Sequence, residues 1–263
     1  MITSPDNKKI KNVVQLLTKS KARKEQDAFV IEGIKLFEEA PEDMIKEVYV
    51  SESCGYRSIK LDKVPHEMVK DEVFRKCTDT LTPQGVLCVV SKKHWTLRDM
   101  MERATEPAPV YMVLETIQDP GNLGTIMRTA EGAGVAGIVM NNETVDIYNP
   151  KTVRSTMGSI FRVPFVYESD LKKSVEELKR AGVTCYAAHL KGSCSCYETD
   201  FKGPTAFFVG NEGNGLSDEL TGLADNLIKI PMGGKLESLN AAVSAAVLMY
   251  EARRQRLAGN ERS

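Results

Sequence analysis

The chain has 263 residues, of which 42% are hydrophobic and 27% are charged, and its formal net charge is −1. This globular composition carries enough apolar content for one large domain or two modest ones. No apolar run reaches membrane-spanning length and the opening MITSPDNKKIKN lacks the apolar core of a signal peptide, which excludes a membrane-spanning protein. We therefore expect a cytoplasmic protein with no membrane partner, whose six cysteines are reduced thiols.

Positive charge gathers near both ends of the chain although the net charge is close to zero. Residues 8–24 contain seven basic residues and no acid, and the last predicted helix ends in Arg253, Arg254 and Arg256. Such clusters suit contacts with a polyanion, although solvated basic ends are common in proteins of any kind.

The first hundred residues predict a small α/β domain, which we place at residues 1–100. Residues 1–25 are expected to form one basic helix, because apolar residues recur among the lysines at helical spacing. A Pro-rich linker is expected at 101–108 and a second domain at 109–263. In the first domain, short strands and helices alternate at 29–31, 34–40, 45–50, 69–76 and 86–90.

The second domain predicts a parallel sheet with helices on both faces, because strands, loops and helices follow one another in a regular order. Ligands of such sheets bind beyond the carboxyl ends of the strands. Those ends are the loops at 115–122, 189–196, 210–216 and 231–240. Strands are expected at 110–114, 137–140, 161–166, 183–188, 205–209 and 228–230, and helices at 123–133, 153–159, 170–181 (with Ser169 as a possible cap) and from 241 onward.

Two apparent motifs do not support a site. Residues 132–137 match GxGxxG, but they close a helix and lead into a strand, the reverse of the dinucleotide-binding order, so we interpret Gly134 as part of a helix stop and turn. That order argues against a nucleotide-dependent oxidoreductase. The spacing of Cys185, His189, Cys194 and Cys196 matches no standard zinc pattern, so we predict plain thiols and no metal.

Three separated segments bring polar residues and glycines to the predicted strand ends. DPGNLGTIMRTA (119–130) places Asn122 at a helix start and Arg128 within that helix. FVGNEGNGLS (208–217) has three glycines that allow close backbone approach to a ligand, and Glu212 is its only acid. IPMGGKLESLN (230–240) delivers Ser and Asn to a helix N-terminus, where free N–H groups can hold polar ligand groups. Taken singly, each segment could be an ordinary turn or helix start with solvated side chains.

Together, N-LGTIMRTA, VGNEGNGLS and IPMGGKLESLN resemble the three motifs of the SpoU (TrmH) family of RNA ribose 2′-O-methyltransferases, part of the SPOUT superfamily. The resemblance follows family order over residues 109–256. The N-terminal part resembles the family's substrate-binding domain through RKEQDAFVIEG and the LTPQG turn. One departure is that Asn240 precedes Ala241-Ala242-Val243, where the family often has Val-Ser-Val. The hydroxyl that the family often has there is therefore absent from this chain.

The resemblance implies S-adenosylmethionine as methyl donor, a deep trefoil knot in the C-terminal domain, and a homodimer whose active site is completed across the interface. It also implies an RNA partner. The cofactor-binding positions that it implies are Gly210, Asn211, Ile230, Met232, Ser238 and Leu239. The catalytic positions that it implies are Asn122, Arg128, Glu212, Ser238 and Asn240.

The family proposal makes the first-motif arginine the general base, but a guanidinium keeps its proton in most sites. We therefore expect Arg128 to orient the target phosphate and to stabilise charge on the 2′-oxygen, with Glu212 holding Arg128 or another donor. The N-terminal domain favours ribosomal RNA over transfer RNA by analogy. A transfer-RNA enzyme and a non-catalytic RNA-binding protein that kept the fold are the alternatives. The expected RNA-binding side chains are Lys19, Lys21, Arg23, Lys24 and Arg128.

Overall fold

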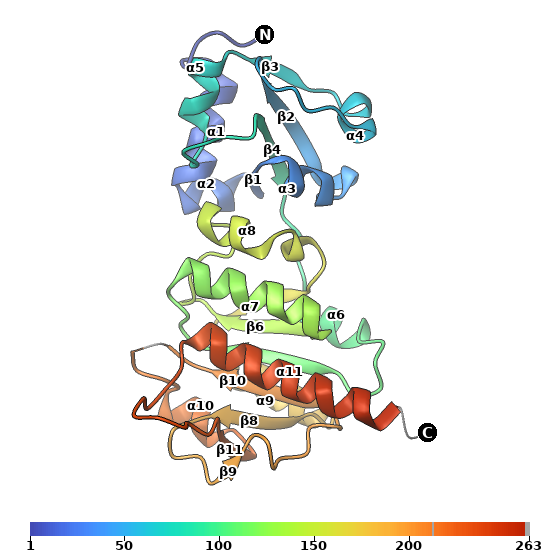
Figure 1. Cartoon of the computed structure of the whole chain (residues 1–263), viewed down its shortest axis with the longest axis vertical. Coiled ribbons are helices and arrows are strands. Elements are labelled where there is room, and N and C mark those ends of the chain that lie inside the picture. Colours follow the sequence, from blue (N-terminus) through green and yellow to red (C-terminus); the bar gives the residue numbers. More distant parts are fainter. Residues whose placement is uncertain (212, 261–263) are drawn as a thin grey trace. The chain divides into compact units, whose positions relative to one another are not determined.

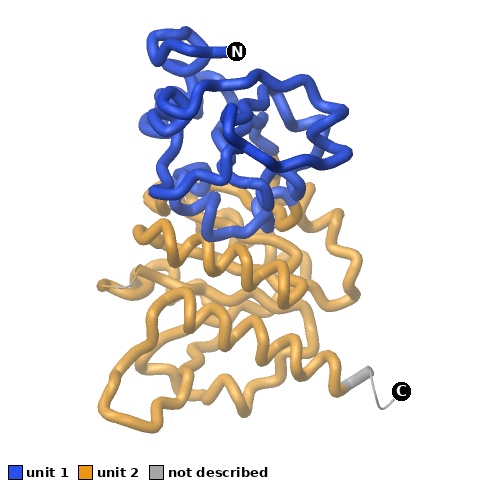
Figure 2. Tube along the Cα trace, turned by 45° about the horizontal axis from the view of Figure 1, so that its top comes forward, with its two compact units in different colours: residues 1–93, 146–161 blue, residues 94–145, 162–263 orange. Residues whose placement is uncertain are grey.

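The computed structural model describes residues 1–211 and 213–260, and the chain forms two compact units (Figure 2). Unit 1 comprises residues 1–93 and 146–161. Unit 2 comprises residues 94–145 and the described chain from residue 162 onward. The segment 146–161 thus belongs to the same unit as the N-terminal residues, although the chain immediately before and after it belongs to unit 2.

Unit 1 is built on a four-stranded sheet in the order β1-β4-β2-β3, in which β4 is antiparallel to β1 and β2, and β3 is parallel to β2. The apolar stripe of α1 packs on this sheet through Ile10, Val13 and Leu16. The elements are α1 (Lys8–Thr18), α2 (Ser20–Glu25), β1 (Ala28–Glu32), α3 (Ile34–Glu39), β2 (Ile45–Ser51), α4 (Ile59–Lys63), β3 (Glu67–Val69), α5 (Asp71–Phe74), β4 (Val86–Ser91) and α8 (Pro150–Thr156). Short 3-10 turns occupy Glu42–Met44, Arg75–Cys77 and Ser159–Phe161.

The single basic helix expected at 1–25 is wrong. Asn7 caps α1 by accepting a hydrogen bond from the backbone N–H of Lys9, and the helix ends at Thr18. Lys19 then adopts an extended conformation (φ −120°, ψ 113°), which separates α1 from α2. The helix expected at 69–76 is also shorter than predicted, because Val69 pairs with Ser51 as the last residue of β3.

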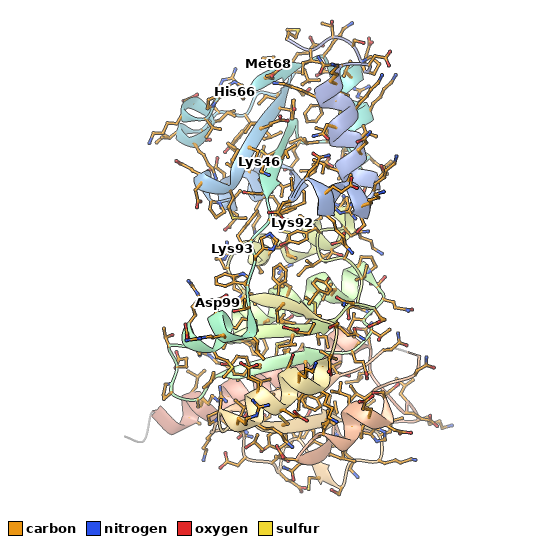
Figure 3. All side chains as sticks on the ribbon, turned by 180° about the vertical axis from the view of Figure 1, so that it is seen from behind. Lys46, His66, Met68, Lys92, Lys93 and Asp99 are labelled. Atoms are coloured by element: carbon orange, nitrogen blue, oxygen red, sulfur yellow. The ribbon has the colours of Figure 1, made fainter. Side chains whose placement is uncertain are left out.

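Several kinds of contact hold the connecting segments of unit 1. Lys46 donates from Nζ to the carbonyls of Gln26 and Asp27, and the Lys92 ammonium lies 4.7 Å from the centre of the Tyr148 ring (Figure 3). The backbone N–H of Ile2 donates to the carbonyl of Met68. Tyr148 belongs to the 146–161 segment, so such contacts include that segment in the fold of unit 1.

Unit 2 contains a seven-stranded, fully parallel sheet in the order β7-β6-β5-β10-β8-β11-β9. All residues of the central strands β5 and β10 are buried, as expected of strands covered on both faces. The elements are α6 (Leu97–Glu102), β5 (Val110–Leu114), α7 (Pro120–Ala133), β6 (Gly137–Asn141), β7 (Phe165–Glu168), α9 (Leu171–Arg180), β8 (Thr184–Ala188), β9 (Cys194–Ser195), β10 (Thr205–Val209), α10 (Asp218–Gly222), β11 (Asn226–Lys229) and α11 (Ala241–Asn260).

Helices cover both faces of this sheet, which confirms the predicted arrangement. One face packs against α6, α9 and α10 through alternate strand residues such as Tyr111, Val113 and Phe208. On the other face α7 and α11 lie side by side (Figure 1). Helix α6 starts with a capping box, in which Thr96 and Asp99 exchange side-chain and backbone hydrogen bonds.

Several boundaries differ from the prediction for physical reasons. Asp170, and not Ser169, caps α9, since its carboxylate accepts from the N–H groups of Lys172 and Lys173. The strand expected at 161–166 begins only at Phe165, because 159–161 form a 3-10 turn. The helix stop predicted at 132–137 is confirmed: Gly134 is left-handed (φ 73°) and ends α7 before β6 begins. Of the helices that the structure describes, none combines the length and apolar character needed to span a bilayer.

Candidate functional site

A cavity of about 630 Å³ lies in unit 2, at the carboxyl ends of β8, β10 and β11. The first residues of α11, including Ala241 and Ser244, form part of its wall. This is the edge where parallel sheets bind their ligands. All six residues expected to bind the cofactor line it: Gly210, Asn211, Ile230, Met232, Ser238 and Leu239.

The glycine loop after β10 is folded tightly against itself. Asn211 and Gly215 exchange both backbone hydrogen bonds, at 3.0 and 2.8 Å. The Asn211 side-chain Oδ1 accepts from the backbone N–H groups of Gly213 and Asn214, and Gly215 is left-handed (φ +71°). A Cβ at Gly210 would lie only 2.2 Å from the carbonyl carbon of Gly215. Only glycine fits at position 210, so backbone rather than side chain faces the cavity there.

The loop between β11 and α11 forms another wall and ends in a helix cap. The Asn240 side-chain Oδ1 accepts from the N–H groups of Ala242 and Val243, at 2.9 and 3.3 Å. Its Nδ2 donates to the Oδ1 of Asn122 on the first turn of α7, at 3.0 Å. Asp119 caps that helix by accepting from the N–H of Asn122. The structure therefore joins the first and third segments, and Ser238 of the third lines the cavity.

Two candidate catalytic residues are not placed at the cavity by the structure. Arg128 is exposed on α7 and does not line the cavity. Glu212 lies outside the described residues. The structure therefore joins Asn122 and Asn240 next to the cavity, since Leu239 and Ala241 on either side of Asn240 line it. Asn122, Asn240 and Arg128 are themselves not among its lining residues.

Some cavity residues were not predicted from the sequence to bind the cofactor, and His189 was considered only as a metal ligand. His189, Leu190, Asn214 and Leu216 also line the cavity. The loops 189–196 and 210–216 were expected to bind a ligand because they follow strands, but strand-end position does not tell which side chains in a loop face the ligand.

The cysteines expected to be plain thiols are separated by the fold. Cys185 is fully buried in the core of unit 2, and burial raises the pKa of its thiol to about 12. Burial also raises the pKa of Cys196, whereas Cys194 is exposed. Metals bind the thiolate, which a raised pKa disfavours. Within the described residues, no three His, Cys, Asp or Glu side chains gather where they could hold a metal ion.

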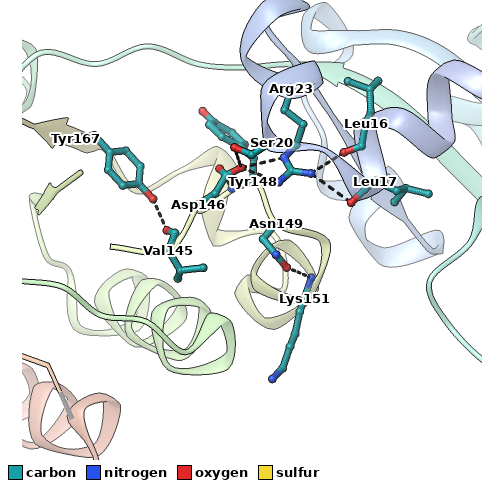
Figure 4. Close-up of polar contacts among 10 residues, drawn as sticks. All are labelled: Leu16, Leu17, Ser20, Arg23, Val145, Asp146, Tyr148, Asn149, Lys151 and Tyr167. Atoms are coloured by element: carbon teal, nitrogen blue, oxygen red, sulfur yellow. Dashed lines mark hydrogen bonds and ion pairs between the residues drawn. The ribbon is translucent and has the colours of Figure 1, made fainter. Parts of the chain in front are cut away.

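The RNA-binding residues predicted at 19–24 divide into two groups. Lys19, Lys21 and Lys24 are exposed. Arg23 is only 3% exposed: its Nε and Nη2 donate to Asp146 Oδ2 at 2.9 and 2.8 Å, and Nη1 donates to the carbonyl of Leu16 at 2.7 Å (Figure 4). This geometry leaves its guanidinium no face for a phosphate, so the expectation that Arg23 binds RNA is corrected to a structural role within unit 1.

Comparisons with known proteins assign both parts of the chain. Residues 109–250 match the SpoU rRNA Methylase family, and residues 7–88 match the MRM3-like substrate binding domain. The 23S rRNA (guanosine(2553)-2′-O)-methyltransferase RlmP of Bacillus subtilis is 36% identical over 254 residues, which cover 96% of this chain and 98% of that protein. The 23S rRNA (guanosine-2′-O-)-methyltransferase RlmB of Neisseria meningitidis is 33% identical over 68% of this chain and 72% of its own length.

Solved structures agree in fold over nearly the whole chain. The SpoU methyltransferase AviRb from Streptomyces viridochromogenes, in complex with the cofactor AdoMet, has a TM-score of 0.85 at 27% identity, covering 95% of this chain and 98% of that one. The AdoMet-bound rRNA methyltransferase from Sinorhizobium meliloti has a TM-score of 0.83 at 32% identity, covering 96% and 97%. The chain therefore belongs to the SpoU rRNA methylase family.

Proposed function

We propose that this protein transfers a methyl group from S-adenosylmethionine to a ribose 2′-hydroxyl of ribosomal RNA. The observation that carries the proposal is the single cavity lined by all six residues that the family motifs assign to the cofactor. The names of the similar RlmP and RlmB enzymes supply the substrate class. A ribosomal RNA substrate is consistent with the cytoplasmic location expected from the sequence.

The residues present fit the cofactor. The cavity volume of about 630 Å³ falls in the range of small-molecule sites. Gly210 lets a ligand approach the backbone, while Ile230 and Leu239 give apolar walls, so backbone groups at these positions would hold the adenosine part. Bound there, S-adenosylmethionine supplies an electrophilic methyl group to an oxygen nucleophile.

The polar residues have separate roles in this proposal. Asn240 and Asn122, bonded to each other at the edge of the third segment, orient the ribose hydroxyl. Arg128 binds the neighbouring phosphate and stabilises negative charge as it develops on the 2′-oxygen, a role that suits the planar, five-donor fork of a guanidinium. Glu212, outside the described residues, is proposed to hold Arg128 or another donor.

A homodimer is part of the proposal, with Arg128 of one chain reaching the cavity of the other. Two observations support it: Arg128 is exposed and outside the cavity of its own chain, and α7 packs beside α11. Along α11, Val243, Tyr250 and Leu257 are 47%, 51% and 50% exposed. Their spacing of seven residues is close to two helical turns, so they form one apolar stripe that a second chain can cover.

We further propose that the end of the chain is threaded as a trefoil knot. Support comes from its path: β11 lies near one edge of the sheet, yet α11 returns to pack on α7 and on the central strand β10 (Figure 1).

We also propose residues 1–100 as the RNA substrate domain and 109–263 as the catalytic domain, joined by 101–108. The exposed Lys19, Lys21 and Lys24 supply phosphate contacts in the first.

The test is transfer of labelled methyl groups to RNA in vitro. Protein is incubated with methyl-tritiated S-adenosylmethionine and either large-subunit ribosomal RNA or bulk transfer RNA, followed by alkaline hydrolysis. We expect label in ribosomal RNA, retained in alkali-resistant dinucleotides because a 2′-O-methyl group blocks cleavage of the adjacent phosphodiester. Label in transfer RNA alone would favour the transfer-RNA alternative. Cofactor binding with no label in any RNA would favour the non-catalytic RNA-binding alternative.

A further inference from the structure

Two consecutive residues after β5 hold both ends of the glycine loop that lines the cavity. The carbonyl of Thr116 accepts a hydrogen bond from the side-chain Nδ2 of Asn211 at 2.9 Å, at the start of the loop. The carboxylate of Glu115 accepts from the backbone N–H and the hydroxyl of Ser217, both at 2.7 Å, at its end. The loop is therefore fixed from outside as well as by its own Asn211–Gly215 pairing.

Thr116 reaches Asn211 from an unfavourable backbone conformation. Its φ is +58°, in the left-handed region that a β-branched residue rarely adopts. Such a conformation is disfavoured and persists only where surrounding contacts enforce it.

Asn141, the last residue of β6, provides those contacts. Its Oδ1 accepts from the backbone N–H of Thr116 at 2.8 Å, and its Nδ2 donates to the Thr116 Oγ1 at 2.8 Å. Thr144, which is buried, donates from its hydroxyl to the same Oδ1 and so fixes the carboxamide orientation. Because the Asn141 carboxamide bonds both the backbone N–H and the hydroxyl of Thr116, it restricts the Thr116 backbone to the conformation that permits both bonds.

We propose that Asn141 and Thr116 are positioning residues for the cofactor: Asn141 holds Thr116 left-handed so that the Thr116 carbonyl fixes the Asn211 loop in its binding shape. The inference rests on the proposed cofactor site, because the loop that they hold is the one that lines the cavity. Neither Asn141 nor Thr116 lines that cavity, so both act through Asn211. The structure thus adds two positions that none of the three motifs contains.

The experiment measures S-adenosylmethionine affinity by calorimetry for variants of the full chain. Asn141→Ala is expected to weaken binding about tenfold, the change that follows loss of one or two hydrogen bonds of usual net strength. Thr116→Gly should stay within about threefold of the original protein, since glycine adopts positive φ without strain. The double variant Thr116→Gly/Asn141→Ala should regain most of the affinity lost in Asn141→Ala. Asn142→Ala, at the exposed neighbouring asparagine, is the matched control.

Thr116→Val separates the hydroxyl from the backbone conformation. It loses the same hydroxyl as Thr116→Gly but keeps a β-branched side chain, so it should bind the cofactor more weakly than Thr116→Gly. In turnover assays Asn141→Ala should raise KM for S-adenosylmethionine with little change in kcat, and RNA affinity should be unchanged. A merely structural role would lower the melting temperature without this KM effect.

The outcomes separate this inference from the proposed function. Unchanged cofactor affinity in folded Asn141→Ala, or no recovery in the double variant, overturns the positioning role while Gly210→Ala still reports on the cofactor site. If Asn141→Ala does not fold, Thr116→Val still removes the hydroxyl that Asn141 bonds, and normal affinity in folded Thr116→Val overturns the role equally. If the original protein does not bind S-adenosylmethionine, the proposed function and this inference fall together.

Discussion

Asn240 and Asn122, 118 positions apart in sequence, meet through a 3.0 Å hydrogen bond in which the Asn240 Nδ2 donates to the Asn122 Oδ1. The same Asn240 uses its Oδ1 to cap α11. The Asn240 carboxamide therefore makes two kinds of contact, one through its oxygen and one through its nitrogen. The cap begins the helix, and the donor joins the first-motif helix to the third-motif loop.

The two tasks of Asn240 can be separated by substitution. Asn240→Asp keeps an oxygen for the cap but replaces the donor with a second acceptor facing Asn122. We expect it to keep the melting temperature and to lose most methyl transfer. Asn240→Ala loses both, and its loss of a cap should lower stability by about 0.5–2 kcal/mol. Asn122→Ala serves as the reciprocal control, with reduced turnover and an intact α11 cap. Full activity in both Asn240→Asp and Asn122→Ala would exclude a role for this bond in catalysis.

Gly210 provides the most direct test of the cofactor site. In Gly210→Ala the new Cβ would lie 2.2 Å from the Gly215 carbonyl carbon and 2.3 Å from its oxygen, so the loop must shift. We expect calorimetric binding of S-adenosylmethionine to be abolished while the protein stays folded. The matched control is Gly222→Ala, where a Cβ meets nothing within 4 Å. Comparable affinities for the two variants would move the cofactor site away from this cavity. Calorimetry should detect no binding of NAD to the original protein or to either variant.

Arg23 is expected to matter for stability rather than for RNA binding. Arg23→Ala removes the ion-pair partner of Asp146, which keeps its bonds from Ser20 and Tyr148, and it leaves the Leu16 carbonyl without its guanidinium donor. We expect this loss to destabilise unit 1 by about 1–3 kcal/mol. Lys21→Ala, at an exposed lysine of the same helix, should change stability by less than about 0.5 kcal/mol. Denaturant unfolding and salt-dependent RNA binding measure the two effects separately. Weakened RNA binding at unchanged stability in Arg23→Ala would restore the role that the sequence had suggested.

The sequence predicts strands, helices and turns that depend on neighbouring residues, but it does not predict contacts between residues far apart in the chain. Neighbouring residues alone predict the strand at 205–209 and the helix stop at 132–137, since both depend on local periodicity and turn chemistry. The pairing of Arg23 with Asp146 spans 123 positions, and no local pattern distinguishes a buried arginine from the exposed lysines beside it. The left-handed conformation of Thr116 could not be predicted from the local sequence either, because Asn141 at the end of β6 imposes it. The catalytic and cofactor roles of the motif residues stay predictions until the variants above are measured.

Buried thiols should make stability fall at alkaline pH. Burial raises the pKa of Cys185 to about 12 and that of Cys77 to about 11, whereas an unfolded thiol titrates near pH ~8.5. The folded state favours the protonated form, so this stability is complete below the unfolded pKa and is lost as pH rises toward the folded values. Melting curves under reducing conditions should show the advantage of the original protein over Cys185→Ala shrinking between about pH 8 and 10. A pH-independent difference would mean that the thiol does not titrate as its burial requires.

The shared active site can be tested by mixing two inactive proteins. If Arg128 acts in the cavity of the partner chain, Arg128→Ala and Asn240→Asp each disable both sites of a homodimer. A heterodimer of the two then contains one site with both residues intact. Mixing them under conditions of subunit exchange should restore about a quarter of the original activity, because half of the dimers are mixed and each has one working site. Tyr250→Asp, on the exposed stripe of α11, should give a monomer in sedimentation and prevent the recovery. A dimer in which no mixture regains activity would place Arg128 in the site of its own chain.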